Sequence, residues 1–143
     1  MVYLDYITAK RKYNGAQDAL CEILDEQEVL FSRTQPTSTK YDRERVEGGD
    51  GANSFDEYVI AKERSQIDKR LEEAKKILNE RKAFLDQRER ELRASRFLID
   101  RIYCMRFLDK MRVNRIASMI GYAESHVYRF LKKIEDSAKD ERK

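Results

Sequence analysis

The chain has 143 residues, with 30 Lys and Arg, 27 Asp and Glu, one proline and one histidine. A charged content of 40% with a single proline is typical of long solvated helices rather than of sheets. One histidine leaves no Ser/His/Asp or Cys/His set and no metal-ligand spacing, so we expect neither an enzyme nor a cofactor or metal site.

The two cysteines and the hydropathy pattern bear on the cellular compartment. Cys21 and Cys104 lie far apart in the chain, as expected for reduced thiols of a cytosolic protein. No signal peptide opens the sequence, and no run approaches the ~18 apolar residues of a membrane span. We therefore expect a soluble cytoplasmic protein with no membrane partner.

The first segment, roughly residues 3–32, carries apolar residues in a seven-residue pattern. Leu24 and Phe31 broaden this stripe beyond a bare coiled-coil seam. Asn14-Gly15 would cost about 1 kcal/mol inside a helix, so a break at that point stays open. The two rows of the pattern are Tyr6, Tyr13, Leu20 and Gln27, and Val2, Ala9, Ala16, Ile23 and Leu30.

Residues 33–53 are polar and contain the only proline and three of the five glycines. This composition predicts a long connection, either mobile or held against the helices by Tyr41 and Val46. Its glycines do not indicate a phosphate-binding loop, because no Gly-Lys-Ser/Thr follows and no strand precedes them.

A long helix is predicted from the capping box Ser54-Phe-Asp-Glu57 onward. Its apolar rows are Leu71, Leu78, Leu85 and Leu92, joined by Ile60, Ile67 and Ala74. Such a charged helix cannot bury its leucines alone. We expect it to pack on the first helix as an antiparallel hairpin, on a second copy of itself, or on both.

Residues 95–109 form another amphipathic helix, which is either separate from the leucine helix or continuous with it. Two sets of side chains are available for burial in this segment. They are Leu98, Ile102, Met105 and Leu108, or Phe97, Tyr103 and Phe107.

The stretch 114–133 reads as two short helices joined by a tight turn. Asn114 and Ser125 are candidate N-cap residues, and Gly121 lies where the first helix must stop. This is the pattern of a helix-turn-helix, whose second helix enters the DNA major groove. The apolar stripes of the two helices are Ile116, Ala117 and Ile120, and Val127, Phe130, Leu131 and Ile134.

Basic charge gathers in the same region, since residues 93–133 hold ten Lys and Arg against three Asp and Glu. This balance favours a polyanion such as double-stranded DNA as the partner, although a solubilising surface has the same composition. The residues expected to contact DNA are Asn114, Arg115, Glu124, Ser125, His126, Tyr128, Arg129, Lys132 and Lys133.

Residues 102–129, Ile-Tyr-Cys-Met-Arg-Phe-Leu-Asp-Lys-Met-Arg-Val-Asn-Arg-Ile-Ala-Ser-Met-Ile-Gly-Tyr-Ala-Glu-Ser-His-Val-Tyr-Arg, resemble region 4 of sigma-70-type factors. They are more similar still to small phage transcriptional regulators of the ArpU/RinA type. Thr39-Lys-Tyr-Asp-Arg-Glu-Arg-Val46 and the polar loop after it are also similar to the linker of that group. One departure is Ala123, where sigma-like motifs more often have Ser.

The resemblance implies a phage or prophage protein that binds a promoter and regulates late-gene transcription in the cytoplasm of a bacterial host. It implies double-stranded DNA as the main partner and host RNA polymerase as a further one. On the family's pattern, Asn114 and Arg115 lie near the DNA backbone, and the residues at groove-facing positions are Ser125, His126, Tyr128, Arg129 and Lys132.

The sequence as a whole predicts an all-α protein. Residues 1–94 form a long, coiled-coil-like helical hairpin with a polar loop at about 33–53, residues 95–136 a helix-turn-helix domain, and residues 137–143 a charged tail. Three functions stay open: a sequence-specific transcription regulator, a DNA-packaging subunit resembling a small terminase, and a module that binds RNA polymerase. The leucine row also permits a homodimer through the N-terminal helices.

Overall fold

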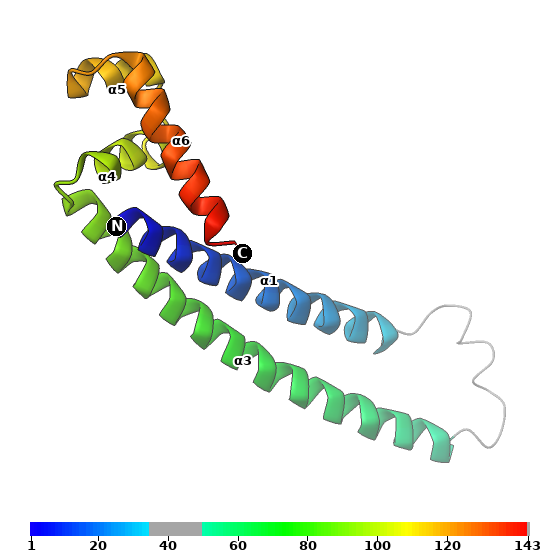
Figure 1. Cartoon of the computed structure of the whole chain (residues 1–143). Coiled ribbons are helices and arrows are strands. Elements are labelled where there is room, and N and C mark those ends of the chain that lie inside the picture. The colour runs from blue at the N-terminus through cyan, green and yellow to red at the C-terminus, as the bar shows by residue number, and fades with distance from the viewer. Residues whose placement is uncertain (35–49, 143) are drawn as a thin grey trace. The chain divides into compact units, whose positions relative to one another are not determined.

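The computed structural model describes residues 1–34 and 50–142. Every regular element in this part of the chain is helical, which confirms the all-α class (Figure 1). The expected contacts of Tyr41 and Val46 lie outside the described residues. The elements are α1 (Val2–Thr34), α3 (Asp50–Ala94), α4 (Leu98–Tyr103), the π-helix η1 (Cys104–Leu108), α5 (Val113–Ile120) and α6 (Glu124–Asp140).

The chain divides into two compact units, and both long helices contribute to each of them. Unit 1 consists of Met1–Asn14 and Glu80–Lys143, and unit 2 consists of Gly15–Asn79. The structure thus divides the chain at other places than the predicted boundary between residues 94 and 95.

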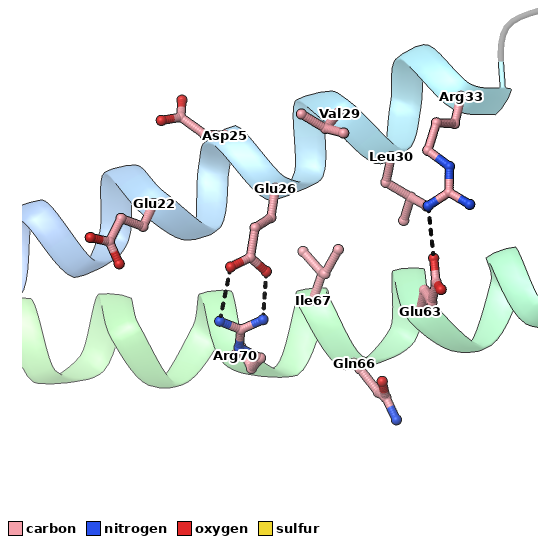
Figure 2. A pocket seen from close by; sticks show the side chains of 10 residues that line it. All are labelled: Glu22, Asp25, Glu26, Val29, Leu30, Arg33, Glu63, Gln66, Ile67 and Arg70. Atoms are coloured by element: carbon pink, nitrogen blue, oxygen red, sulfur yellow. Dashed lines mark hydrogen bonds and ion pairs between the residues drawn. The ribbon is translucent and has the colours of Figure 1, made fainter.

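In unit 2, α1 and α3 run antiparallel, which is one of the arrangements expected for the heptad rows. Two ion pairs, Glu26–Arg70 and Arg33–Glu63, mark the direction and register of this hairpin (Figure 2). The buried side chains all come from the predicted rows and are Ile23, Leu30, Ile67 and Ala74.

The expected broadening of the buried stripe by Leu24 and Phe31 is wrong, because these side chains are 41% and 57% exposed. One neighbouring helix covers only one side of α1, and both residues lie on a flank of the seam. Leu24 and Phe31 therefore stay outside the buried stripe formed by the described residues of unit 2.

Both long helices extend further than some local signals indicate. α1 runs without a break through Asn14 and Gly15, and a Cβ added at Gly15 would meet nothing within 4 Å. α3 begins at Asp50, so Ser54 lies inside the helix and not at its start. The placement of the helix start at the capping box is therefore wrong by about one turn.

Unit 1 has a core to which α1, α3, α4, η1, α5 and α6 all contribute. At its centre, the Tyr103 ring stacks on Tyr3 with 5.6 Å between ring centroids, and meets the Tyr6 ring edge at 6.0 Å. The buried residues of this core are Tyr3, Tyr6, Leu92, Ile102, Tyr103, Cys104, Val113, Ile116, Ala117, Val127 and Ile134.

The segment after the leucine helix is separate from it, because α3 ends at Ala94 and α4 begins at Leu98. Neither predicted set of side chains is buried as a whole. Ile102 comes from one set and Tyr103 from the other, whereas Phe97 and Phe107 are 69% and 43% exposed. The chain passes here from an α-helix into a π-helix, so neighbouring residues share the inner face and simple α-helical spacing fails.

Asp100 explains why the start of the chain belongs to unit 1. Its carboxylate is fully buried and accepts a hydrogen bond from the Tyr3 backbone N–H at 3.1 Å and another from the Ser95 hydroxyl at 2.6 Å. The N–H groups of a first helical turn have no partner within their own helix. Asp100 thus caps the first turn of α1.

A search of the described helices finds none with both the length and the apolar character that crossing a membrane requires.

Candidate nucleic-acid interface

The turn between α5 and α6 is built on Gly121, as the sequence predicts. Gly121 has φ 80° and ψ 24°, the left-handed conformation that glycine adopts without steric cost. The backbone N–H groups of Gly121 and Tyr122 both donate to the Ala117 carbonyl, at 2.9 and 3.2 Å. This pair of bonds closes the end of α5 and lets the chain turn into α6.

The two helices of the motif pack through small and apolar side chains. Ile116 and Val127 are fully buried, and Ala117 is 6% exposed. Ile134 extends the buried stripe of α6, while Phe130 is half-buried. The stripe predicted for the second helix is therefore confirmed, and it fixes which face of α6 points outward.

The predicted N-cap residues are wrong. α5 begins at Val113 after an extended Arg112, and α6 begins at Glu124 after an extended Ala123. Neither of these preceding residues makes a side-chain capping bond. The extended backbone starts each helix early, so Asn114 and Ser125 lie inside the first turns and do not occupy the N-cap positions.

Asn114 instead acts locally, because its Oδ1 accepts a hydrogen bond from the Arg115 backbone N–H at 2.8 Å. The carbonyl of Ala123, where sigma-like motifs more often have Ser, accepts from the N–H groups of His126 and Val127 at 3.0 and 3.3 Å. The departure at Ala123 thus leaves the backbone start of α6 intact.

All nine residues predicted to contact DNA are exposed in unit 1. They lie at the start of α5 and in the first three turns of α6. They are Asn114, Arg115, Glu124, Ser125, His126, Tyr128, Arg129, Lys132 and Lys133. Four cations against one carboxylate make this a basic surface.

Within α6, three of these residues lie on one face. Ser125, Arg129 and Lys132 are spaced four and three positions apart, which aligns them along the helix. Neither Arg129 nor Lys132 forms an ion pair with another described residue. Their charges are therefore available to an anionic partner.

Two further side chains are positioned by aromatic rings. The His126 ring meets the Tyr122 ring edge-on, with 6.2 Å between centroids. The Lys133 ammonium lies 5.8 Å from the centroid of the half-buried Phe130 ring, within cation–π range. These contacts restrict both residues, but they leave them exposed.

Sequence reasoning missed the turn that precedes α5. Lys110 has φ 54° without being glycine, and the Met111 N–H donates to the Met105 carbonyl at 2.9 Å. Arg106 donates to the Met111 carbonyl at 3.0 Å. The turn ends at the exposed Arg112, which lies at the same end of α5 as Asn114 and Arg115. The position of Arg112 just before the helix start is the sequence signal that could have identified this residue.

Other chemistry is sparse in the described part of the chain. No group of three His, Cys, Asp or Glu side chains gathers there in a way that could hold a metal ion. Cys21 is exposed and Cys104 is buried, and burial raises the pKa of the Cys104 thiol. A thiol with a raised pKa forms less thiolate and is therefore less reactive.

Comparisons of the chain with protein-family models, with curated proteins and with solved structures found no match.

Proposed function

We propose that the protein is a sequence-specific DNA-binding transcriptional regulator of a phage or prophage, which reads a promoter or operator of late genes with α6. The observation that carries this proposal is the exposed row Ser125, Arg129 and Lys132 on a helix whose opposite side is anchored by the buried Val127. A helix anchored in this way can present long polar side chains in a fixed position to the major groove of DNA.

The residues divide into two roles by their reach and chemistry. His126 and Arg129 lie in the first two turns of α6, and an Arg guanidinium can donate two parallel hydrogen bonds to a guanine edge. Lys132, Lys133 and Arg115 supply compact or flexible cations that suit phosphate oxygens. In this scheme the first group sets sequence preference, and the second supplies salt-sensitive affinity.

The test begins with selection of bound sequences from random duplexes, followed by fluorescence-anisotropy titration over a range of salt concentrations. Lys132→Ala should weaken binding to every duplex alike and reduce the slope of log K against log salt by about 1. Arg129→Ala should cost about 1–3 kcal/mol on the preferred duplex and much less on others.

The matched control is Lys82→Ala, which removes an exposed lysine of unit 1 on α3, outside the proposed interface. This variant should bind as the parent does. If the selection enriched no sequence, or if Lys82→Ala weakened binding as much as Lys132→Ala, α6 would not be the reading helix.

A second function is favoured by one observation. Met119 on α5 and Tyr122 in the turn are 57% and 48% exposed, and apolar side chains of this size suit a protein surface better than a phosphate backbone. A module that binds RNA polymerase would use them, with or without DNA. Co-purification with polymerase that Met119→Ser abolishes, in the absence of any duplex binding, would select this function.

A further inference from the structure

A pocket in unit 1 lies away from the helix face proposed to read DNA. It has a volume of about 280 Å³ and is formed by α1, the segment of α4 and η1, and the C-terminal part of α6, all within unit 1. Ala138, which lines it, follows Ser125 by 13 residues on α6, about 20 Å along the helix axis. The pocket is therefore a separate feature of the unit.

Much of the lining of this pocket is apolar. Ile134 is 2% exposed, Phe107 is 43% exposed, and Ile7 and Ala138 are half-buried. Small-molecule sites are concave and mostly apolar, and the volume of this pocket is close to the lower end of their range of about 300–1,000 Å³. The pocket thus suits a small ligand whose larger part is apolar.

The charged residues that line the pocket are Lys10, Arg11, Arg142 and Glu135. None of the three cations forms an ion pair with another described residue. Glu141, the acid beside Arg142 in the chain, is engaged with Thr8, whose hydroxyl donates to Glu141 Oε2 at 3.3 Å. Three cations against one carboxylate leave the lining with an excess of positive charge, which favours an anionic ligand.

Two polar groups of the lining are held in place by the fold. Arg11 Nη2 donates to the Ala138 carbonyl at 3.0 Å, which fixes the guanidinium beside α6. Tyr103 is 7% exposed, and its hydroxyl makes no hydrogen bond with a described residue. No unpaired side-chain oxygen of the described residues is sealed from solvent, so this hydroxyl belongs to the accessible part of Tyr103. Burial raises the pKa of Tyr103, so the hydroxyl keeps its proton at neutral pH and can donate to a ligand.

We propose that this pocket binds a small arylalkanoic acid as its carboxylate. The apolar body packs against Phe107 and Ile134, and the carboxylate is held by the cations and the Tyr103 hydroxyl. A carboxylate suits these donors, because its two oxygens accept from a guanidinium, an ammonium and a hydroxyl together. One negative charge is favoured over two, since Glu135 in the same lining would repel a dianion. The site is independent of the proposed function, because none of the nine residues assigned to DNA lines it.

The test is a titration of the full chain with hydrocinnamate in the absence of DNA, followed by amide and methyl NMR. We expect saturable shifts at Ile7, Phe107 and Ile134, with a dissociation constant in the millimolar range or below. Hydrocinnamyl alcohol has the same body without the charge, and acetate has the charge without the body. Each should bind about tenfold more weakly or worse, because each lacks one of the two kinds of contact.

Three variants test the residues that hold the carboxylate. Lys10→Gln and Arg142→Gln should each raise the dissociation constant of hydrocinnamate by about two- to fivefold, as expected for exposed charges. Tyr103→Phe keeps the shape of the side chain but lacks the donor, and should raise the constant by about tenfold. The matched control is Lys12→Gln, an exposed lysine of α1 that faces another direction than Lys10 and should leave the constant unchanged.

Circular dichroism should show the parent helix content in all four variants. The proposal is overturned by an absence of saturable shifts, by shifts outside the pocket, or by alcohol or acetate that binds as tightly as hydrocinnamate. It is also overturned if Tyr103→Phe binds as the parent does, or if Lys12→Gln weakens binding as much as Lys10→Gln. Loss of duplex binding in Lys10→Gln and Arg142→Gln, without any binding of hydrocinnamate, would assign these cations to DNA instead. A failure to bind any duplex would leave the result with hydrocinnamate untouched.

Discussion

Unit 1 and unit 2 are both built from α1 and α3, yet their buried side chains differ in how completely water is excluded. In unit 1, Ile116, Val127 and Leu92 have no exposed surface. In unit 2, the four buried residues keep between 4% and 9% of theirs. The same heptad rows run through both units, so the difference lies in what covers them.

The comparison shows what additional helices contribute to a core. In unit 1, α4, η1, α5 and α6 join α1 and α3 in one hydrophobic cluster. Among the described residues of unit 2, two helices share a single seam with a groove on each flank. A hairpin of this kind gains most of its stability from tertiary packing, and it gains more when a further layer covers it.

The largest effect expected from this difference comes from truncating one isoleucine in each unit. Ile116→Ala in unit 1 should lower the free energy of unfolding by about 2–5 kcal/mol, because the surrounding core cannot collapse around the cavity. Ile67→Ala in unit 2 should cost clearly less at concentrations where the chain is monomeric, since its side chain is already partly hydrated. Urea denaturation of both variants measures the two costs. Equal costs in the monomer would remove the distinction between the cores.

A second effect distinguishes the aromatic centre of unit 1 by its response to pH. Burial, together with the neighbouring Tyr6 and Cys104, raises the pKa of Tyr103 to about 12 from an ordinary value of 10.0. The folded state therefore holds this proton more tightly than the unfolded state. The stabilisation is fully present below pH 10 and is lost as the pH rises from about 10 to about 12, by about 2–3 kcal/mol.

Thermal unfolding of the parent and of Tyr103→Phe across this pH range measures the effect. The variant lacks the titrating hydroxyl and should lose less stability over the same interval. A smaller dependence should remain in the variant, since burial also raises the pKa of Tyr6. Identical pH profiles for the two proteins would contradict the assignment to Tyr103.

The smallest effect concerns the carboxylate that connects distant parts of unit 1. Asp100→Ala leaves the Tyr3 N–H without its acceptor in a buried position, at an expected cost of about 1–3 kcal/mol. Amide hydrogen exchange should show faster exchange at the start of α1, while unit 2 amides keep their protection. Asp109→Ala, which removes an exposed carboxylate together with its exposed ion pair to Arg93, is the control. Uniform loss of protection over both units would argue against a local cap.

Much of this fold could be predicted from periodicity. Leu92, Ile67 and Ala74 were assigned to the buried rows by their seven-residue spacing, and all three are buried. Gly121 was assigned to the turn by its position after an apolar stripe, and it has the expected left-handed backbone. These features depend on residues near one another in the sequence, where propensity and pattern act together.

The predictions that failed, and the contacts that were missed, depend on features that local sequence does not encode. The helices start at Val113 and Glu124, directly after the extended backbone of Arg112 and Ala123. Asn114 and Ser125, which the sequence pattern favours as N-caps, are therefore the second residues of their helices. The capping of α1 by Asp100 could not be predicted, because its partner Tyr3 is 97 residues away in the sequence. The nine proposed contact residues are exposed, but their contact with DNA stays a prediction.

The hydrogen bond between Tyr3 and Asp100 has a consequence for how the molecule assembles as it is made. The first turn of α1 leaves the ribosome long before the residue that caps it has been translated, so the nascent helix end must wait in water with its amides hydrated. Joining residues so distant in the chain requires closing a large loop, a step whose entropic cost slows folding. Elements with near neighbours in sequence, such as α5 and α6, close a shorter loop when they pair, so we expect the start of α1 to join unit 1 after them.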